Sequence, residues 1–443
     1  MENSLDRKIT KGMLLRFSLP TIISMIFMSI YTTVDGVFVS RLVGTDALSA
    51  VNIVLPLITV AIALGTMIGT GGSAIVARKM GEGKASEARQ DFSLLFCVGC
   101  VTALVFSLAG FLFLDPVLKF LGADAKLYPF CVDYAETTLL FLPFSVFAIM
   151  FQVFFVTAGK ASLSLLLSAC GGVCNMILDY VFISIFEMGI RGAALATGIG
   201  YLLPSAVGFC YFSLCRTGTL YFVKPAFRGN TILHTFGNGS SEMVTNLSMG
   251  VVTILLNNIL MRMCGSDGVA SITIILYAQG IMTAAYIGYA LGIAPLVSFN
   301  YGKGDTARLK KIHRISLGMI LISSVVILLA SELFAGPLVA IFSPKGTKVY
   351  SMAVRGFRLF SAGFLFMGYN IYGSAVFTAL SNGKISAVLS FLRTLVFVVA
   401  SALLLPMALQ TDGVWLSIPL AELLGFLLTF FFLHKFRKTY GYA

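Results

Sequence analysis

The second half of this chain repeats the first at a fixed offset of 221 residues, and this duplication constrains the fold more than any other feature. The segment GTDALSAVNIVLP at 44–56 returns as GSDGVASITIILY at 265–277. At the same offset, without a gap, the matching residues are Arg41, Asp46, Gly71, Val76, Gly81 and Gly83, which align with Arg262, Asp267, Gly292, Val297, Gly302 and Gly304. The sequence therefore predicts two copies of one structural unit.

Each copy consists mainly of long apolar runs. Of the 443 residues, 58% are hydrophobic and 11% are charged, and apolar runs of about 18 residues or more are typical of helices that cross a bilayer. The predicted spans are 14–39, 46–77, 92–115, 132–158, 161–186, 192–215, 237–261, 268–298, 313–334, 352–380, 385–409 and 413–434. The predicted fold is an all-α integral membrane protein with twelve transmembrane helices in two six-helix bundles.

The longest polar stretch between spans, RTGTLYFVKPAFRGN at 216–230, separates the two copies. We expect an N-terminal lobe at 1–215, a cytoplasmic linker at 216–236 and a C-terminal lobe at 237–443. Because each lobe has an even number of spans, both lobes begin on the same side of the membrane. A pseudo-twofold axis along the membrane normal then relates them, and a central cavity lies between them.

Lys and Arg residues indicate the orientation. They concentrate in the N-terminal segment, the 78–89 loop, the linker, the 303–314 loop and the C-terminal tail. Cytoplasmic loops carry such an excess, so both termini are expected in the cytoplasm. The expected location of the chain is the inner (plasma) membrane. The net charge of +12 follows from this bias. Since the basic residues are divided among short loops, no nucleic-acid partner is expected.

The first apolar stretch is expected to stay as an uncleaved anchor. It is long, contains Pro20 and Asp35, and lacks a small-residue cleavage site after a short core.

Three patterns suggest other chemistry but fail on their context. CVGC at 97–100 matches a redox or metal pair, yet it lies mid-helix without histidines or partner cysteines. The loops MGEGKASEAR and YGKGDTARLK lack the spacing of a phosphate-binding loop, and no strand precedes them. The three histidines, His234, His313 and His434, fall at predicted helix ends. We therefore expect neither an enzyme nor a cofactor.

Ionisable groups inside a span cost at least a few kcal/mol each, so their presence asks for a reason. Away from the span ends they are Asp35, Asp179, Glu242, Arg393 and Glu422, and Asp133, Glu136 and Arg358 lie nearer the edges. Asp35 and Asp179 do not repeat, because the offset places Leu256 opposite Asp35 and the apolar segment RTLVFVVASALLLP opposite the surroundings of Asp179. A duplicated scaffold with a polar cluster in one copy indicates a functional site.

Three of the polar positions share one depth in the membrane. Asp35, Asp179 and Thr197 lie six to eight residues from charged residues at the outer ends of their helices, roughly 9–12 Å below the external boundary. Asn175 precedes Asp179 by four residues, so both project from one face of a helix. Two carboxylates, an amide and a hydroxyl from three helices are therefore predicted to converge.

Such a pocket fits two roles. Two carboxylates in a dry site cannot both stay ionised cheaply, so one of them binds a proton readily. Alternatively, the oxygens of Asp35, Asn175, Asp179 and Thr197 form an oxygen-only shell suited to Na⁺. The competing interpretation is that these groups only tie helices together by hydrogen bonds.

Other polar and flexible side chains are expected near the central cavity. Glu242 falls in the cytoplasmic third of its span, where it would attract a cationic substrate; the alternative is a helix-start carboxylate near His234. Arg393 either pairs with Glu422 or extends to the interface. Thioethers and aromatic faces suit varied organic cations, and candidate positions are Met25, Met28, Tyr31, Met282, Tyr286, Tyr289 and Tyr369.

These segments resemble a known family. SLPTIISMIFMSIYTTVDGVFVSRLVG at 18–44, GGVCNMILDYVFI at 171–183 and GIRGAALATGIG at 189–200 are similar to motifs of multidrug and toxic compound extrusion (MATE) transporters, bacterial type. The resemblance covers the whole chain. It implies two six-helix lobes in a V around a central cleft, alternating access, and a cation-coupling role for Asp35, Asn175, Asp179 and Thr197. Glu242 departs from this pattern, since some members also carry a cation-linked acid on the seventh helix.

The function predicted from these observations is a secondary antiporter that exports lipophilic, often cationic drugs or metabolites in exchange for H⁺ or Na⁺. Its partners would be small organic cations, the coupling ion and membrane lipids, and we expect a monomer. The alternative is a lipid-linked oligosaccharide flippase of the same superfamily. That function needs a basic cavity, and Arg393 is the one cation that lies away from the ends of the predicted spans. Neither the substrates nor the choice between H⁺ and Na⁺ follows from the sequence.

Overall fold

The structure is a computed structural model that describes residues 4–6, 8–38, 43 and 45–442, and no strand occurs among them. Its first half contains η1 (Ser4–Asp6), α1 (Lys11–Phe38), α2 (Thr45–Gly81), α3 (Ala85–Leu112), α4 (Leu114–Phe120), α5 (Tyr128–Thr157), α6 (Ala161–Asp179), the π-helix η3 (Tyr180–Ile185) and α7 (Gly189–Leu214). Its second half contains α8 (Gly229–Cys264), α9 (Ser266–Lys303), α10 (Thr306–Ala340), α11 (Lys348–Ser361), α12 (Phe364–Ala379), α13 (Gly383–Phe391), the π-helix η4 (Leu392–Val396) and α14 (Phe397–Tyr440).

Ten helical stretches in the described part of the chain are long and apolar enough to cross a membrane. Two local features explain the difference from the twelve predicted spans. The predicted span 352–380 is divided between α11 and α12, each too short to count alone. The stretch Gly383–Tyr440 is 58 residues long and contains two predicted spans, separated by a break at Gln410, where φ is 51°. The all-α membrane fold is confirmed.

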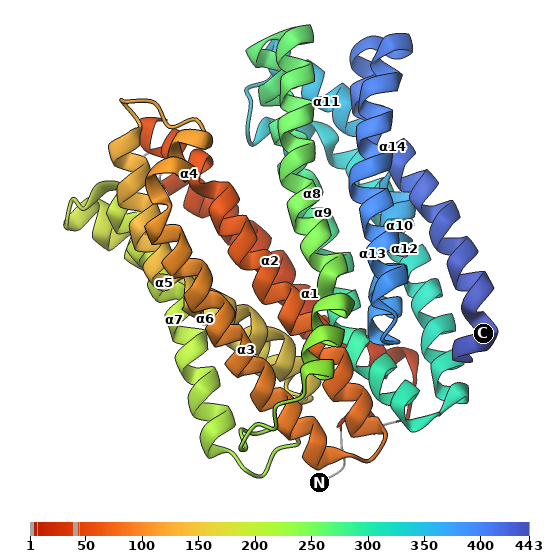
Figure 1. The fold of residues 1–443 in the computed structure, drawn as a ribbon. Helices are drawn as coiled ribbons and strands as arrows, with labels where there is room; N and C mark the ends of the chain where they lie inside the picture. Colours follow the sequence, from red (N-terminus) through yellow and green to blue (C-terminus); the bar gives the residue numbers. More distant parts are fainter. Residues whose placement is uncertain (1–3, 7, 39–42, 44, 443) are drawn as a thin grey trace.

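The helices of the two halves form two groups that lie nearest to each other at one end (Figure 1). Toward the opposite end the groups diverge, as Figure 1 shows for α2 and α8. Contacts between the halves come mainly from α1 with α9, α2 with α8, and α2 with α9. The N-terminus lies at the end where the groups approach.

Glycines allow this close approach, and their contacts obey the repeat. A Cβ on Gly81 would overlap the carbonyl oxygen of Phe299, and a Cβ on Gly302 would overlap that of Arg78. These two contacts are related by the offset of 221, so α2 and α9 cross on the pseudo-twofold axis.

A second pair of crossings is related in the same way. A Cβ on Gly71 would lie 2.7 Å from the backbone nitrogen of Gly239, and one on Gly292 would lie 2.8 Å from Cα of Ser18. The offset of 221 relates Gly71 to Gly292 and Ser18 to Gly239. The α2–α8 contact therefore mirrors the α9–α1 contact.

Both termini lie at the end where the halves touch. Before α1, Asp6 forms an ion pair with Lys303 at the end of α9 (2.7 Å). At the other end of the chain, Tyr440 accepts a hydrogen bond from Asn382 (2.7 Å) and packs on Tyr301. The α9–α10 connection therefore contacts the first residues of the chain and adjoins the last.

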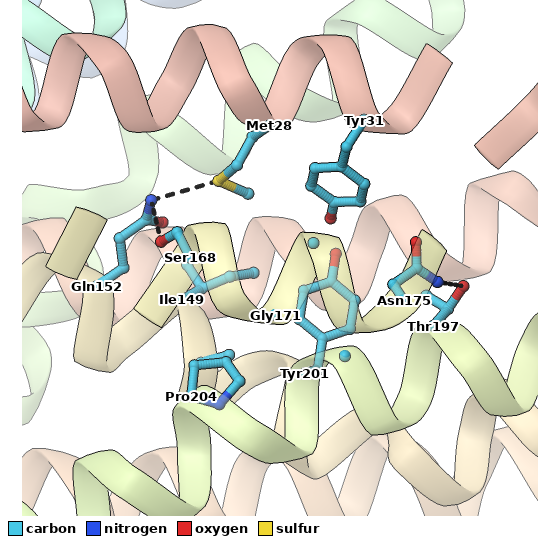
Figure 2. A pocket seen from close by; sticks show the side chains of 13 residues that line it. Met28, Tyr31, Ile149, Gln152, Ser168, Gly171, Asn175, Thr197, Tyr201 and Pro204 are labelled. Atoms are coloured by element: carbon cyan, nitrogen blue, oxygen red, sulfur yellow. Dashed lines mark hydrogen bonds between the residues drawn. The ribbon is translucent and has the colours of Figure 1, made fainter. Parts of the chain in front are cut away.

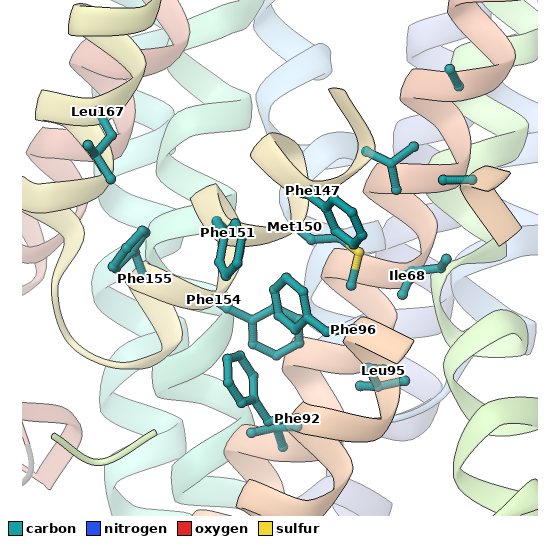
Figure 3. Close-up of a cluster of buried hydrophobic side chains, with 14 of the residues drawn as sticks. Ile68, Phe92, Leu95, Phe96, Phe147, Met150, Phe151, Phe154, Phe155 and Leu167 are labelled. Atoms are coloured by element: carbon teal, nitrogen blue, oxygen red, sulfur yellow. The ribbon is translucent and has the colours of Figure 1, made fainter. Parts of the chain in front are cut away.

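An aromatic core fills the first half and holds the connection between the halves (Figure 3). Phe92 and Phe96 of α3 pack against Phe151 and Phe154 of α5, with ring centroids 4.4–5.6 Å apart. Phe222, which precedes α8, stacks on Phe92 at 5.0 Å. The residues between α7 and α8 are thus packed on the first half.

Candidate functional site

The predicted cation site lies in the interior of the first half, where α6 ends. Asp179 is the last residue of α6, and its side chain has no exposed surface. The π-helix η3 follows it directly. Since π-helical segments inside longer helices often occur at functional sites, and a buried carboxylate is costly without a role, the local structure sets this position apart.

Asn175 and Thr197 meet beside it, as the sequence predicts. The Asn175 amide donates a hydrogen bond to the Thr197 hydroxyl, with 3.3 Å between Nδ2 and Oγ1. The helices α6 and α7 can come this close because Gly171 has no side chain. A Cβ at this position would lie only 2.7 Å from the carbonyl oxygen of Gly200. Asn175 is 97% buried, and no described residue donates to its Oδ1.

A small cavity opens next to this pair (Figure 2). Its polar lining comes from Tyr31 of α1, Gln152 of α5, Ser168 and Asn175 of α6, and Thr197 and Tyr201 of α7. Figure 2 shows the hydroxyls of Tyr31 and Tyr201 directed into the same space. Met28 and Pro204 supply apolar walls.

Gln152 connects three helices around the cavity. Its amide nitrogen lies 3.1 Å from the Ser24 hydroxyl, 3.3 Å from the Met28 sulfur and 3.4 Å from the Ser168 hydroxyl. These contacts join α5 to α1 and α6. A helix that moves relative to the others must therefore rearrange hydrogen bonds at this end of the cavity.

Asp35 belongs to α1, but its side chain lies outside the described part of the structure. Its contribution to the site stays a prediction. Of the four predicted coupling residues, Asn175 and Thr197 are in contact, and Asp179 lies one turn beyond Asn175 on the same helix. Among the described residues, no group of three or more His, Cys, Asp or Glu is placed to hold a metal ion.

The predicted substrate residues divide into three environments. Met28 and Tyr31 line the cavity of the first half. Tyr286 is instead buried in the core of the second half, where its hydroxyl lies 3.2 Å from both Ser324 Oγ and Phe364 O. Met282 packs on the same core, and Tyr369 packs on Phe426 with centroids 5.4 Å apart.

Glu242 lies on α8 close to the crossing with α2. It is half-buried, and no described residue forms a hydrogen bond with its carboxylate. One turn further on, Asn246 donates to Thr66 of α2 across the interface (3.4 Å). Because α8 begins at Gly229, well before the predicted start at 237, Glu242 lies in the fourth turn of the helix and is no helix-start residue.

Sequence reasoning missed Gln152, Ser168 and Tyr201 as lining residues. Gln152 carried a detectable signal, because it is an uncharged polar residue in the middle of an apolar run. Ser168 and Tyr201 gave no such signal, since both residue types are common in membrane helices.

Two repeats of apolar helices, with a buried polar site in one of them, define a membrane transporter. The MatE family model matches the chain twice, at residues 20–181 and at 242–403. The chain therefore belongs to the MATE family of multidrug-efflux transporters and is a secondary transporter, not an enzyme. The two matches, one in each half, agree with the repeat found in the sequence.

Relatives of known name support this membership. The chain is 24% identical over 391 residues to the multidrug export protein MepA of Staphylococcus saprophyticus, covering 88% of this chain and 85% of that protein. It is 24% identical over 442 residues to MepA of Staphylococcus haemolyticus, covering 98% and 95%. Both relatives are bacterial proteins, and this chain is a multi-pass membrane protein.

Solved structures share the fold. A crystal structure of MATE in complex with MaL6 superposes with a TM-score of 0.94 at 21% identity, over 100% of both chains. An outward-facing multidrug resistance MATE transporter of the MOP superfamily gives 0.93 at 21% identity, covering 100% of this chain and 99% of that one.

Proposed function

We propose that the chain exports organic cations from the cytoplasm in exchange for H⁺ or Na⁺, and that the ion binds in the first half at Asp179, Asn175, Thr197 and Asp35. The observation that carries the proposal is the complete burial of Asp179 beside the Asn175–Thr197 pair and a small polar cavity. A carboxylate in this position changes charge when it takes up a cation, and such a change can drive a conformational step.

The exported cation would be held between the halves. Glu242 supplies a negative charge there without a hydrogen-bonded partner among the described residues. Met28, Tyr31, Met282 and Tyr369 are the proposed apolar contacts, whereas Tyr286 is buried inside the second half and is not one of them. Multidrug export is the activity named for the MepA relatives, which supports a substrate range of drugs. We propose a monomer in the inner (plasma) membrane that needs no cofactor.

The proposed cycle alternates between two states. With both termini in the cytoplasm, the contacts of α1, α2, α8 and α9 close the cytoplasmic side, and the space between the diverging ends opens outward. Uptake of the ion from outside neutralises the Asp179 site and favours release of the exported cation. Loss of the ion to the cytoplasm restores the negative charge and favours a new substrate.

The flippase alternative predicts the opposite charge in the central space. A site for a pyrophosphate needs several unpaired cations. Arg393 is buried and paired with Glu422 at 3.0 Å, so its charge is already balanced. This pairing favours export of cations.

The experiment is substrate efflux in proteoliposomes with a pH gradient and a sodium gradient imposed separately. We expect one of the two gradients to drive efflux by the wild type and Asp179→Asn to abolish that response. Asp124→Asn is the matched control, because Asp124 is an exposed loop residue whose Oδ1 accepts two backbone hydrogen bonds that asparagine can also accept. Efflux by Asp179→Asn at the wild-type rate with the wild-type ion dependence contradicts the proposal.

A further inference from the structure

The second half contains a buried charged cluster in place of a polar cavity. Arg393 of η4 and Glu422 of α14 form an ion pair, with 3.0 Å between Nη1 and Oε1. Asn370 of α12 donates to the same carboxylate, with 2.6 Å between Nδ2 and Oε2. All three residues are more than nine-tenths buried.

The repeat relates this cluster to the cavity of the first half. At the offset of 221, Asn370 corresponds to Ile149, Arg393 to Gly172 and Glu422 to Tyr201. All three counterparts line the cavity beside Asn175 and Thr197. The charged cluster of the second half therefore occupies the position that the cavity has in the first half.

Glycines fit the interior of each half to the side chains that it contains. A Cβ on Gly425 would lie 2.9 Å from Cγ of Arg393, so this glycine makes room for the arginine side chain. Its counterpart is Pro204, which lines the cavity. In the first half, a Cβ on Gly172 would lie 2.7 Å from the ring of Phe27, so no side chain fits where the second half has its arginine.

The cluster contains oxygen acceptors of the kind that bind a cation. Two come from the Glu422 carboxylate. A third acceptor in the cluster, Oδ1 of Asn370, is buried and has no hydrogen bond from a described residue. Burying an ion pair in a membrane helix costs several kcal/mol before the attraction is counted. A scaffold that needed only to pack would fill this volume with apolar side chains, as most of the second half does.

We propose that Arg393 is a tethered cation that permanently occupies a second cation site, formed by Glu422 and Asn370, so that only the first half exchanges its ion. The proposal rests on the proposed coupling role of the first half. The site would accept a free guanidinium or another small monovalent cation once the arginine side chain is removed. In the native protein the charge of the second half is then constant through the cycle.

The test is chemical rescue of Arg393→Ala. We expect this variant to unfold at a lower temperature than the wild type, because Glu422 loses its counter-ion. Guanidinium chloride, up to about 20 mM, should raise its melting temperature by several degrees with saturation, as expected for a ligand that binds the folded state. Tetramethylammonium chloride at the same ionic strength should not, since it donates no hydrogen bonds.

Three variants make the result specific. Arg355→Ala removes an arginine that is exposed and paired with Asp412, and it should gain nothing from guanidinium. Arg393→Ala with Glu422→Gln lacks both charges and should fold without guanidinium and ignore it. Arg393→Ala with Asp179→Asn should still respond, because the responding site is in the second half.

Two results would overturn the proposal. One is a response of Arg393→Ala to guanidinium that does not saturate or that tetramethylammonium reproduces. The other is a large change in the ion concentration for half-maximal efflux by the doubly neutral variant, Arg393→Ala with Glu422→Gln. This second test applies even if Arg393→Ala alone does not fold. The two proposals can fail independently. If guanidinium does not rescue Arg393→Ala, the proposed coupling role of Asp179 is unaffected. If Asp179 proves to have no coupling role, a successful rescue still shows a cation site in the second half.

Discussion

The repeat is preserved at the contact between the halves and is not preserved in their interiors. At the contact, Gly81 and Gly302 approach the backbone at positions 299 and 78, which are equivalent under the repeat. In the interiors, the polar pair Asn175 and Thr197 corresponds to Val396 and Ile418. Symmetry is retained where the halves must pack together and lost where a site is built.

This difference has a physical reason. Two equivalent crossings make the same contacts on both sides of the axis, so both halves contribute equally to closing the end where they meet. A second site that exchanges its ion is not needed, because each buried carboxylate without a permanent counter-ion costs free energy. The second half fills the equivalent volume with Arg393, Glu422 and Asn370.

The largest effect is expected from breaking the symmetric contact. In Gly81→Ala the new methyl group would overlap the carbonyl oxygen of Phe299, and backbone cannot move aside as a side chain can. Overpacking costs about 1–3 kcal/mol, which lowers the population of the closed end by about fivefold or more. Distances between spin labels at the ends of α2 and α9 should lengthen, and efflux should fall with them.

The repeat supplies a second variant and a control for this prediction. Gly302→Ala should have the same effect, because its methyl group would overlap the carbonyl oxygen of Arg78. Gly318→Ala in α10 should have none, since nothing lies within 4 Å of the new methyl group. Unequal effects of the two interface variants would mean that the contact is not symmetric in function.

A smaller effect is expected from making the interiors alike. Asn175→Leu removes an amide beside Asp179, and losing one hydrogen-bonding group costs about 1–3 kcal/mol. The ion concentration for half-maximal efflux should therefore rise about tenfold. The reciprocal change, Val396→Asn, should leave that concentration unchanged. A shift of similar size in Val396→Asn would place an exchanging ion in the second half.

The sequence predicts the helices because they rest on local patterns, and it predicts the contact of Asn175 with Thr197 because the two residues lie near one depth on neighbouring helices. Hydropathy locates spans, and four-residue spacing places Asn175 and Asp179 on one face of α6. The division of the 352–380 span into α11 and α12 escapes prediction, because the residues on both sides of the turn at Gly363, FSAGFLF at 360–366, are apolar or small.

Which face of a helix looks inward is harder to predict. Tyr286 was expected near the central space, but α9 is apolar on all sides, so its rotation depends on contacts with other helices. The same holds for the pairing of Arg393 with Glu422, which the sequence left open. Contacts across distant helices, such as Gly71 with Gly239, follow from packing and have no local pattern.

A moderate effect on stability is expected where the second half makes room for its arginine. Gly425→Ala adds a methyl group 2.9 Å from Cγ of Arg393, and we expect a loss of about 1–3 kcal/mol. Thermal unfolding in detergent would measure it. Gly250→Ala on α8, where nothing lies within 4 Å, is the control and should change little. An unaffected Gly425→Ala would show that Arg393 is free to shift, which weakens the comparison of the two interiors.

The smallest effects are expected at two ion pairs between the halves. In each, a residue just before the first helix of one half pairs with a residue of the other half. Asp6, before α1, pairs with Arg308 of α10, and Arg228, before α8, pairs with Glu87 of α3 (3.1 Å). Arg308 and Glu87 are equivalent under the repeat, so the two contacts match in position and are reversed in charge. Both pairs are partly exposed to solvent, so each contributes little to stability.

The two contacts should differ in strength and agree in their response to pH. Arg228 also binds Asp91, which is fully buried, so Arg228→Ala should destabilise the protein more than Asp6→Asn. Hydrogen bonds from Lys303 and then Arg308 hold the pKa of Asp6 below its ordinary 3.8, and a hydrogen bond from Lys79 holds the pKa of Glu87 below 4.5. Stabilisation by carboxylates with lowered pKa values is complete above those ordinary values and is lost only as the pH falls through the lower, folded-state values. Between pH 5 and 8, thermal unfolding of Asp6→Asn should therefore differ from the wild type by a constant amount. If the difference in thermal unfolding grows across this range, then protonation at these contacts affects stability. The comparison of the two halves instead assigns proton binding to the interior of the first half.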